Sequence, residues 1–331
     1  MYKRQVLEGS VRKFGNQIRI TAQLIDGSTG GHMWAEKFDR ELADVFAVQD
    51  EITFAIVKAM KVNLTEGEIA RLEEGETHDL RAWEAFHQAV LEFLKYTKES
   101  NLQARALFDR ALKYDPNYVD AKIYMAFTHC MDGRSGYVAD RSEAMRKAHV
   151  IYEGIGPAGK ETANAKNFEA FYNVLMGNFE QALAGADATV ERGPCRMFGF
   201  APAAQVYMYC GKPHAALRLL KISMRLSPFL PSDVLYFIAY VSAWIGDYAR
   251  AIKAAEEYGR RIPGDVYAYV VKAIVYGMAG EAESSASTVK ELLSLFPNYT
   301  VKEFAAHEAY RDEADLEKVA SILHAAGLPE G

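Results

Sequence analysis

A glycine and a proline recur in fixed register through residues 162–297 of this chain. Successive glycines are 34, 35 and 34 residues apart, and a proline follows each glycine 17 residues later. The glycines are Gly177, Gly211, Gly246 and Gly280, and the prolines are Pro194, Pro228, Pro263 and Pro297. A period near 34 residues is typical of a solenoid of two-helix units, in which each unit buries its apolar face only against its neighbours. The register therefore predicts a helical repeat.

Small residues recur in the same register on both sides of each glycine. One stands five positions after it and another stands seven positions before it. They are Ala182, Ala216, Ala251 and Ser285 on one side, and Ala170, Ala204, Ala239 and Ala273 on the other. Small side chains let paired helices approach closely, glycine ends the first helix in a left-handed conformation, and proline stops the second helix. Each repeat should therefore consist of two helices and two turns.

The chain as a whole is predicted to be mainly α. Ala104, Phe108, Ala111 and Pro116 reproduce the A-x3-F-x2-A-x4-P tail of a tetratricopeptide repeat. We expect a tetratricopeptide-type, right-handed α-solenoid of about six helix pairs, preceded by a small, incomplete α/β domain. The expected boundaries are 1–64 for the α/β domain, 65–79 for an acidic linker, 80–157 for two looser repeats with an insertion near 132–140, 158–297 for four regular repeats, and 298–331 for a C-terminal capping helix.

Residues 6–38 alternate as strands do, and apolar residues recur at helical spacing from Val45 to Ala59. Residues 6–13 and 17–25 predict a β-hairpin, because Gly15 and Asn16 supply the positive φ of a tight turn. A third short strand is expected at 32–38. The following helix should begin after Asp44 and pack across the sheet, because an uncovered three-stranded sheet would expose one apolar face to solvent.

Composition excludes several classes of function. A net charge of −6 and a pI near 5.8 argue against a protein that neutralises phosphates, so we expect no nucleic acid partner. The three cysteines lie far apart and form no CxxC, which favours reduced thiols in the cytoplasm over disulfides or zinc. The longest apolar run, 234–245, is too short to span a membrane. The strand pattern is already under way at Val6, so we expect an N-terminally truncated fragment. The sequence does not predict the oligomeric state.

No motif predicts a catalytic residue, a cofactor site or a metal site. Residues 154–159 formally match the G-x-G-x-x-G dinucleotide fingerprint, but a helix is expected before them where the fingerprint needs a strand. An inter-repeat turn explains these glycines. The eight histidines never stand at the H-x3-H or H-E-x2-H spacing that places two ligands on one helix face.

A binding surface is the more promising functional feature. In a stacked array of helix pairs the first helices line the concave side, and side chains opposite the small packing residues face the groove. The residues in this register are Asn167, Phe171, Phe198, Gln205, Tyr236, Tyr240 and Tyr267. Aromatic and amide side chains suit the capture of a peptide. The alternative is that these tyrosines belong to the core between repeats.

The segment VLEGSVRKFGNQIRITAQLIDGSTGGHMWAEKFDRELADVFAVQDEI resembles the end of a small α/β domain that is related to the amino-terminal domain of TolB. In many bacterial proteins that domain precedes tetratricopeptide repeats, and it commonly follows a class III adenylate/guanylate cyclase domain. The closing DEADLEKVASILHAAGLPEG resembles the end of such proteins. No cyclase residue has a counterpart here, and several repeat tails carry Ala186, Leu220, Ala255 or Val289 where an aromatic is usual.

The resemblance implies a non-catalytic regulatory module that binds a protein or peptide partner, with its own upstream cyclase domain as one candidate. A second architecture in the same family carries a winged-helix DNA-binding domain in place of the cyclase. The alternative is therefore the sensor half of a transcription regulator. An autonomous enzyme is a third hypothesis, for which no motif in these residues speaks.

Overall fold

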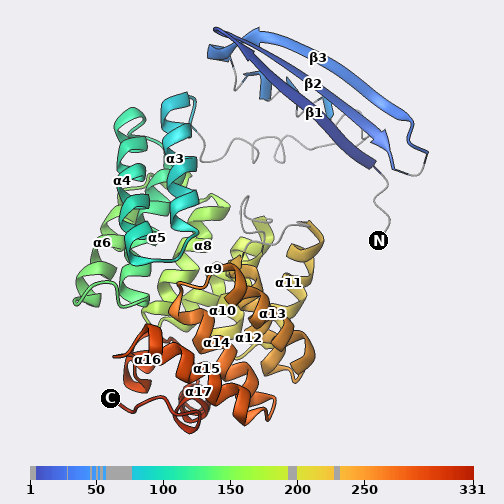
Figure 1. Ribbon diagram of the computed structural model, residues 1–331. Helices are drawn as coiled ribbons and strands as arrows, with labels where there is room; N and C mark the ends of the chain where they lie inside the picture. Colours follow the sequence, from blue (N-terminus) through green and yellow to red (C-terminus); the bar gives the residue numbers. More distant parts are fainter. Residues whose placement is uncertain are drawn as a thin grey trace. The chain divides into compact units, whose positions relative to one another are not determined.

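The computed structural model describes residues 5–27, 29–44, 47–49, 51–52, 55–56, 77–192, 200–226 and 232–331. The chain divides into two compact units, Met1–Glu74 and Gly75–Gly331. The first unit holds a small β-sheet, and the second is an array of helices (Figure 1). Among the described residues, no helix is long and apolar enough to cross a membrane.

The sheet of the first unit is antiparallel and has the strand order β1-β2-β3. Its strands are β1 (Gln5–Phe14), β2 (Gln17–Asp26) and β3 (His32–Glu41). Gly15 has a φ of 58° in the two-residue turn between β1 and β2, which confirms the predicted hairpin. Ile18, Ala22 and Leu24 of β2 share one face, as the period of two requires, and all three are buried.

The chain after β3 turns helical, beginning with the 3-10 turn η1 (Leu42–Asp44). Residues 47–49, 51–52 and 55–56 are helical, and Val48 is buried. Arg40 of β3 donates from Nη2 to both carboxylate oxygens of Glu51, at 2.8 and 2.9 Å. The rest of the predicted covering helix and the acidic linker up to residue 76 lie outside the described residues.

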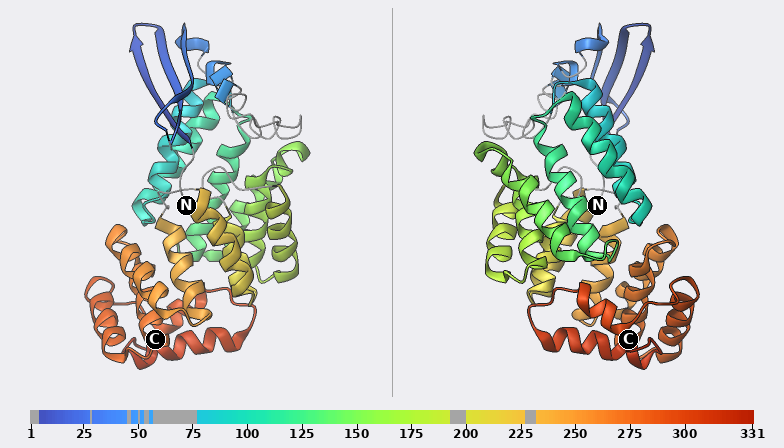
Figure 2. Two further views of the ribbon diagram at one scale, coloured as in Figure 1. Left: turned by 90° about the vertical axis from the view of Figure 1, so that its right-hand side faces the viewer. Right: turned by 90° about the vertical axis from the view of Figure 1, so that its left-hand side faces the viewer.

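The second unit is built from helices that pair with their neighbours along the chain (Figures 1 and 2). The helices are α3 (Leu80–Phe93), α4 (Lys98–Tyr114), α5 (Val119–Arg134), α6 (Arg141–Glu153), α7 (Pro157–Lys160), α8 (Ala163–Leu175), α9 (Phe179–Arg192), α10 (Ala201–Tyr209), α11 (Pro213–Leu226), α12 (Ser232–Trp244), α13 (Tyr248–Arg261), α14 (Val266–Met278), α15 (Ala282–Leu295), α16 (Val301–His307) and α17 (Glu313–Ala325). The first helix of each pair also packs on the first helix of the next, as in α8, α10, α12 and α14. This is the stacking of a tetratricopeptide-type solenoid.

The recurring glycines end the first helix of each regular repeat in the predicted conformation. All four have a φ between 71° and 81°, where a side chain would be strained. In the last two repeats the next amide reaches back to close the helix end: Asp247 N donates to Ser242 O at 2.9 Å, and Glu281 N donates to Tyr276 O at 2.9 Å. Pro263 follows the end of α13 and Pro297 follows the end of α15, whereas the other two repeat prolines lie outside the described residues.

The small residues lie where paired helices touch. All eight of them are at most 2% exposed. Ser285 of α15 donates its hydroxyl to the carbonyl oxygen of Ala273 of α14 at 2.8 Å, so two members of the register contact each other directly. A Cβ added at Gly185 of α9 would lie 3.0 Å from the Cβ of Ala170 of α8. The paired helices are therefore too close at these positions for larger side chains, as the spacing predicts.

Two regions depart from the regular repeat. Helix α5 continues through Arg134, into the range where the sequence indicates an insertion. The final range, 298–331, holds two helices where one was expected: α16, and α17 at the position predicted for the last helix. Helix α17 packs on α14 and so takes the place of the first helix of a further repeat.

Candidate functional site

The described residues that were predicted to face the groove are all buried inside the helical unit. Their exposed fractions are 4% for Asn167, 6% for Phe171, 5% for Gln205, 5% for Tyr236, 2% for Tyr240 and 5% for Tyr267. Phe198 lies outside the described residues. All of these buried residues except Tyr240 line one cavity. The structure thus brings five of the predicted residues together, and their role in binding stays a prediction.

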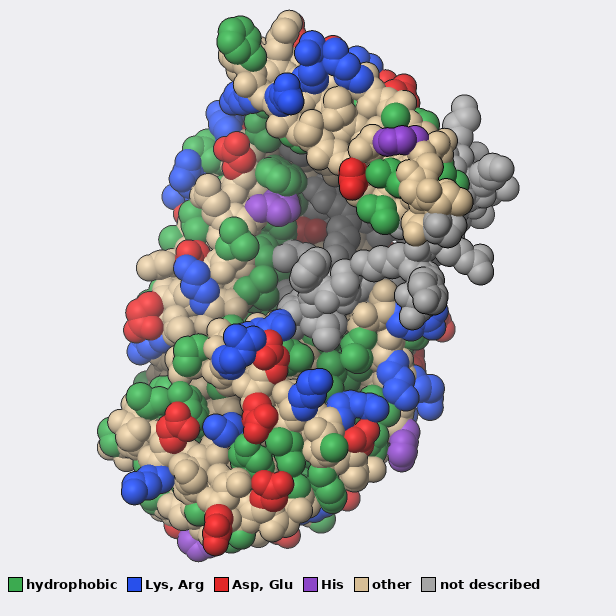
Figure 3. All heavy atoms as spheres, turned by 45° about the vertical axis from the view of Figure 1, so that its right-hand side comes forward, with side chains coloured by type: hydrophobic (Ala, Val, Ile, Leu, Met, Phe, Trp, Pro, Cys, Tyr) green, Lys and Arg blue, Asp and Glu red, His purple; other side chains and the backbone are tan. Residues whose placement is uncertain are grey.

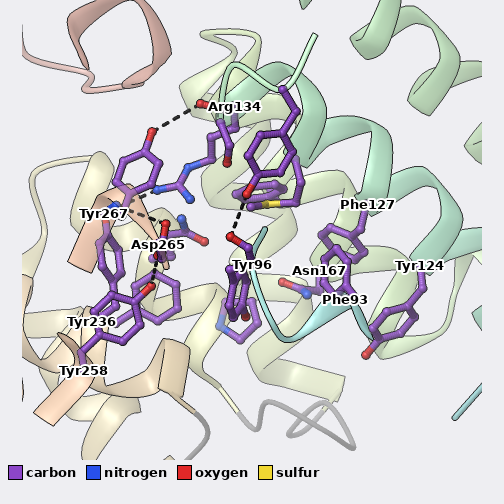
Figure 4. A pocket seen from close by; sticks show the side chains of 17 residues that line it. Phe93, Tyr96, Tyr124, Phe127, Arg134, Asn167, Tyr236, Tyr258, Asp265 and Tyr267 are labelled. Carbon is purple, nitrogen blue, oxygen red and sulfur yellow. Dashed lines mark hydrogen bonds between the residues drawn. The ribbon is translucent and has the colours of Figure 1, made fainter. Parts of the chain in front are cut away.

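This cavity, which we call the aromatic pocket, contains about 810 Å³ of space between atoms, its open mouth included. Its walls come from α3, α5, α8, α10, α12 and α13 and from the start of α14. Most of the wall is aromatic, and examples are Phe93, Tyr124, Phe127, Tyr236, Tyr258 and Tyr267 (Figure 4). Rigid aromatic walls with a few polar groups are typical of sites that bind an apolar side chain or a small molecule.

Arg134 supplies a positive charge at the edge of the aromatic pocket. The last turn of α5 carries it there, and its side chain is buried. Its guanidinium carbon lies 4.7 Å from the ring centroid of Tyr267 and 5.9 Å from that of Tyr236. Nη2 donates to the hydroxyl oxygens of Tyr209, at 3.2 Å, and Tyr236, at 3.4 Å. Among the described residues, the aromatic rings and hydroxyls therefore hold the cation, and no acid pairs with it directly.

Asp265 is the acidic group of the same pocket. It caps the N-terminus of α14, where Oδ1 accepts the backbone N–H of Tyr267 at 3.1 Å. Oδ2 accepts the hydroxyl of Tyr258. Burial raises the pKa of Asp265, although both hydrogen bonds act in the opposite direction. The pocket therefore has an acid whose charge is disfavoured by its surroundings.

Asn167 adds a polar group that is not fully satisfied. Its side-chain oxygen Oδ1 is sealed from solvent and has no hydrogen-bond partner in the described part of the chain. A buried acceptor without a donor costs about 1 to 3 kcal/mol. The wall of the aromatic pocket at α8 thus contains an acceptor that a donor would stabilise.

Residues 306–311 comprise the end of α16 and the link toward α17, and we call them the C-terminal strap. They contact helices far away in sequence. Arg141 of α6 donates from Nη1 to the carbonyl oxygen of Ala306 at 2.6 Å, across 165 residues. His307 Nδ1 lies 3.1 Å from the carbonyl oxygen of Gly133, to which it must donate. In Figures 1 and 2, α16 accordingly lies beside the green helices α5 and α6.

The other end of the strap is held by α9, α10 and α12. The hydroxyl of Tyr310 donates to that of Tyr240 at 2.7 Å. The backbone N–H of Arg311 donates to the carbonyl oxygen of Tyr209 at 2.9 Å, and its guanidinium pairs with Glu180 at 2.5 Å. The strap therefore ties the second repeat to the third, fourth and fifth.

Glu308, in the middle of the strap, is joined to Arg134 through one hydroxyl. Tyr209 accepts a hydrogen bond from Arg134 and donates its own proton to Oε2 of Glu308 at 2.8 Å. Oε1 of Glu308 is sealed and has no partner within the described residues. Burial raises the pKa of Glu308, while Arg134 and Tyr209 oppose that rise. The pocket and the strap thus share a chain of three buried polar side chains.

The sequence patterns did not predict a role for Arg134, Tyr209 or Glu308. Arg134 was placed in an insertion, and only the uninterrupted α5 brings it inside. Tyr209 follows Gln205 by one helical turn, so the groove register contains a signal for it. Glu308 carries no local signal, because its partners lie 99 residues and more away.

Other chemistry is not indicated by the described residues. No group of three or more His, Cys, Asp or Glu side chains among them is placed to hold a metal ion. Cys130 and Cys210 are free and buried, and burial raises the pKa of Cys210 to about 11. A thiol that stays protonated is a poor nucleophile. On the face drawn in Figure 3, basic and acidic side chains alternate over the helical unit, so positive charge is not gathered there.

No family model matches the chain. A stretch of 118 residues is 48% identical to a protein of Rhizobium meliloti (strain 1021) named "Putative adenylate cyclase 3". The stretch covers 36% of this chain and 20% of that protein, so the match spans about a fifth of the relative's length.

Solved structures share the helical architecture. A chain of the APC/C hetero-tetramer Cut9–Hcn1 aligns with a TM-score of 0.50 at 14% identity, over 86% of this chain and 54% of that one. A tetratricopeptide repeat protein from Parabacteroides merdae ATCC 43184 aligns with a TM-score of 0.41 at 12% identity, over 74% of this chain and all of that one. At such identities the similarity concerns the fold alone. The helices and strands described above make the chain mainly α, with a tetratricopeptide-type solenoid and a small three-stranded sheet, as predicted.

Proposed function

We propose that this chain is a protein-interaction module in the regulatory part of a class III adenylate/guanylate cyclase-like protein. In this proposal the module captures a protein segment by inserting an apolar or aromatic side chain into the aromatic pocket. The partner is a segment of the cyclase domain of the same protein. The partial homology to a protein with an adenylate cyclase name supports the choice of this partner.

The aromatic pocket is the observation that carries the proposal. It lies among the first helices of successive repeats, where α5, α8, α10 and α12 each contribute side chains. Anchor side chains that enter such pockets supply most of the binding energy of protein interfaces. Tyr and Phe walls offer large contact areas at a low entropic cost, because few of their torsions have to be fixed.

A mixing experiment tests the proposal. The purified chain is added to a separately purified cyclase domain from a protein of the matched type, and cyclase activity and complex size are measured. We expect binding to be weakened by Phe127→Leu, which shortens a pocket wall, and to be unchanged by Phe296→Leu, a half-buried control outside the pocket. If the native chain changes neither the activity nor the oligomeric state of the domain, the proposal is wrong.

A further inference from the structure

Arg134 is a buried cation with donors to spare. No ion pair within 4.0 Å joins its guanidinium to a carboxylate of the described residues. Both of its side-chain hydrogen bonds start at Nη2. Nε and Nη1 therefore have no acceptor among these residues. Arg134 lines the aromatic pocket, and it is the cationic side chain among the lining residues.

An unpaired buried charge is costly. Each ion taken from water into a protein interior costs several kcal/mol unless an opposite charge and hydrogen bonds compensate. In this chain the compensation is indirect, because Tyr209 stands between Arg134 and Glu308. A group that pairs directly with Arg134 would therefore gain more than it would at an exposed arginine.

We propose that the aromatic pocket binds an apolar or aromatic group that bears a carboxylate, that this carboxylate pairs with Arg134, and that the pairing loosens the C-terminal strap. The inference rests on the proposed function and adds the chemistry of the ligand and its effect on the chain. The strap is affected because Tyr209 then loses the cation that orients its hydroxyl toward Glu308. Glu308 acts here as the internal competitor of the ligand.

The acidic groups around the pocket favour a monoanion over a phosphate. Asp265 and Glu308 both lie near Arg134, and they would repel a second negative charge on the ligand. Burial raises the pKa of both acids, which reduces their opposition to a single carboxylate. The aromatic walls require the rest of the ligand to be apolar, because a polar group buried there would lack partners.

Two matched probes test the charge on the native chain without any substitution. N-acetylphenylalanine carries the carboxylate, and N-acetylphenylalanine amide replaces it with a neutral group of the same size. We expect calorimetry to give at least tenfold tighter binding of the acid. Acetyl-Glu-Phe-amide carries a side-chain carboxylate and no terminal one, so its binding shows whether an acidic side chain can supply the charge. We expect inorganic phosphate to bind more weakly than N-acetylphenylalanine.

Substitutions test the coupling to the strap. Glu308→Gln removes the competing charge, so it should tighten the binding of the acid several-fold and leave the affinity for the amide unchanged. Glu303→Gln, on the exposed surface of α16, is the matched control. Arg134→Gln should abolish the preference for the acid. Hydrogen exchange of residues 301–311 in the native chain should speed up when the acid is added and not when the amide is added.

Each outcome decides something. Equal affinities for acid and amide would overturn the inference, yet they would leave the pocket as the apolar site of the proposed function. If the acid is preferred but hydrogen exchange of the strap does not change, the coupling between Arg134 and the strap is wrong and the inference is overturned. The pocket would again remain the apolar site of the proposed function. If neither probe nor acetyl-Glu-Phe-amide binds at millimolar concentration, the ligand class is wrong, and the mixing experiment with the cyclase domain still judges the proposed function separately.

Discussion

The hydroxyl of Tyr209 lies 2.8 Å from Oε2 of Glu308, although 99 residues separate the two in sequence. Tyr209 ends helix α10, and Glu308 stands in the strap between α16 and α17. The contact joins the middle of the solenoid to its end, and Tyr209 also accepts from Arg134. One phenol oxygen therefore links a buried cation to a buried acid.

Tyr209→Phe should destabilise the chain without disturbing its packing. The ring stays, while Arg134 and Glu308 each lose a partner in the interior, so we expect a loss of about 1 to 3 kcal/mol in the free energy of unfolding. Urea denaturation measures the loss. Tyr276→Phe is the control, because its hydroxyl bonds Glu256 at an exposed position, and there we expect a loss below about 0.5 kcal/mol. Equal effects of the two substitutions would contradict a buried relay.

Glu308→Gln should change the pH dependence of stability. Burial raises the pKa of Glu308, so the folded chain holds this proton more tightly than the unfolded chain. The stability that this proton contributes is present below the pKa of the unfolded carboxyl, about 4.3, and is lost as the pH rises through the higher folded pKa.

The native chain should therefore lose stability relative to Glu308→Gln as the pH rises above about 4.3, by at most about 1.4 kcal/mol per pH unit. Urea denaturation of both chains at several pH values measures this difference. Glu303→Gln should give a difference that stays constant with pH. A Glu308→Gln difference that is equally flat would show that Glu308 has an ordinary pKa.

The register of glycines and small residues predicted the solenoid because those features are local. A glycine with a positive φ and two alanines at a helix contact act within one repeat of about 34 residues, so their spacing alone reveals them. The same register placed Asn167, Phe171, Gln205, Tyr236 and Tyr267 on one side of the array, and they do line one cavity.

The strap and the charge at Arg134 were not predictable in the same way. The strap is held by contacts that span up to 174 residues, and no local pattern encodes such pairings. Arg134 is brought inside by an extra helical turn in a segment whose glycines and serine indicate a loop. Tertiary packing overrode that local preference, and the longer helix places Arg134 in the aromatic pocket.

Gly280→Ala and Gly259→Ala should have opposite effects, although they are the same substitution. Gly280 has a φ of 81°, which alanine adopts only with strain, so we expect a loss of about 1 kcal/mol. Gly259 lies inside helix α13, and nothing stands within 4 Å of an added Cβ. Alanine should stabilise that helix by about 0.5 to 1 kcal/mol. Thermal unfolding of both variants checks the signs, and a gain for Gly280→Ala would contradict the turn geometry.

Tyr240→Ser distinguishes the two interpretations of the groove tyrosines. A groove-facing tyrosine tolerates serine with little loss, whereas a core tyrosine leaves a cavity that costs about 3 to 5 kcal/mol. Tyr240 is 2% exposed, its hydroxyl accepts from Tyr310, and it does not line the aromatic pocket, so we expect the large loss. Tyr240→Phe keeps the ring and should cost about 1 kcal/mol.

Tyr248→Ser is the control for this comparison, because Tyr248 is 39% exposed at the start of the neighbouring helix α13. It should lose less than about 1 kcal/mol in the same urea titration. If Tyr240→Ser is as mild as this control while helicity is kept, Tyr240 faces a groove after all. That result would also mean that the hydrogen bond from Tyr310 of the strap does not hold the Tyr240 ring in the core.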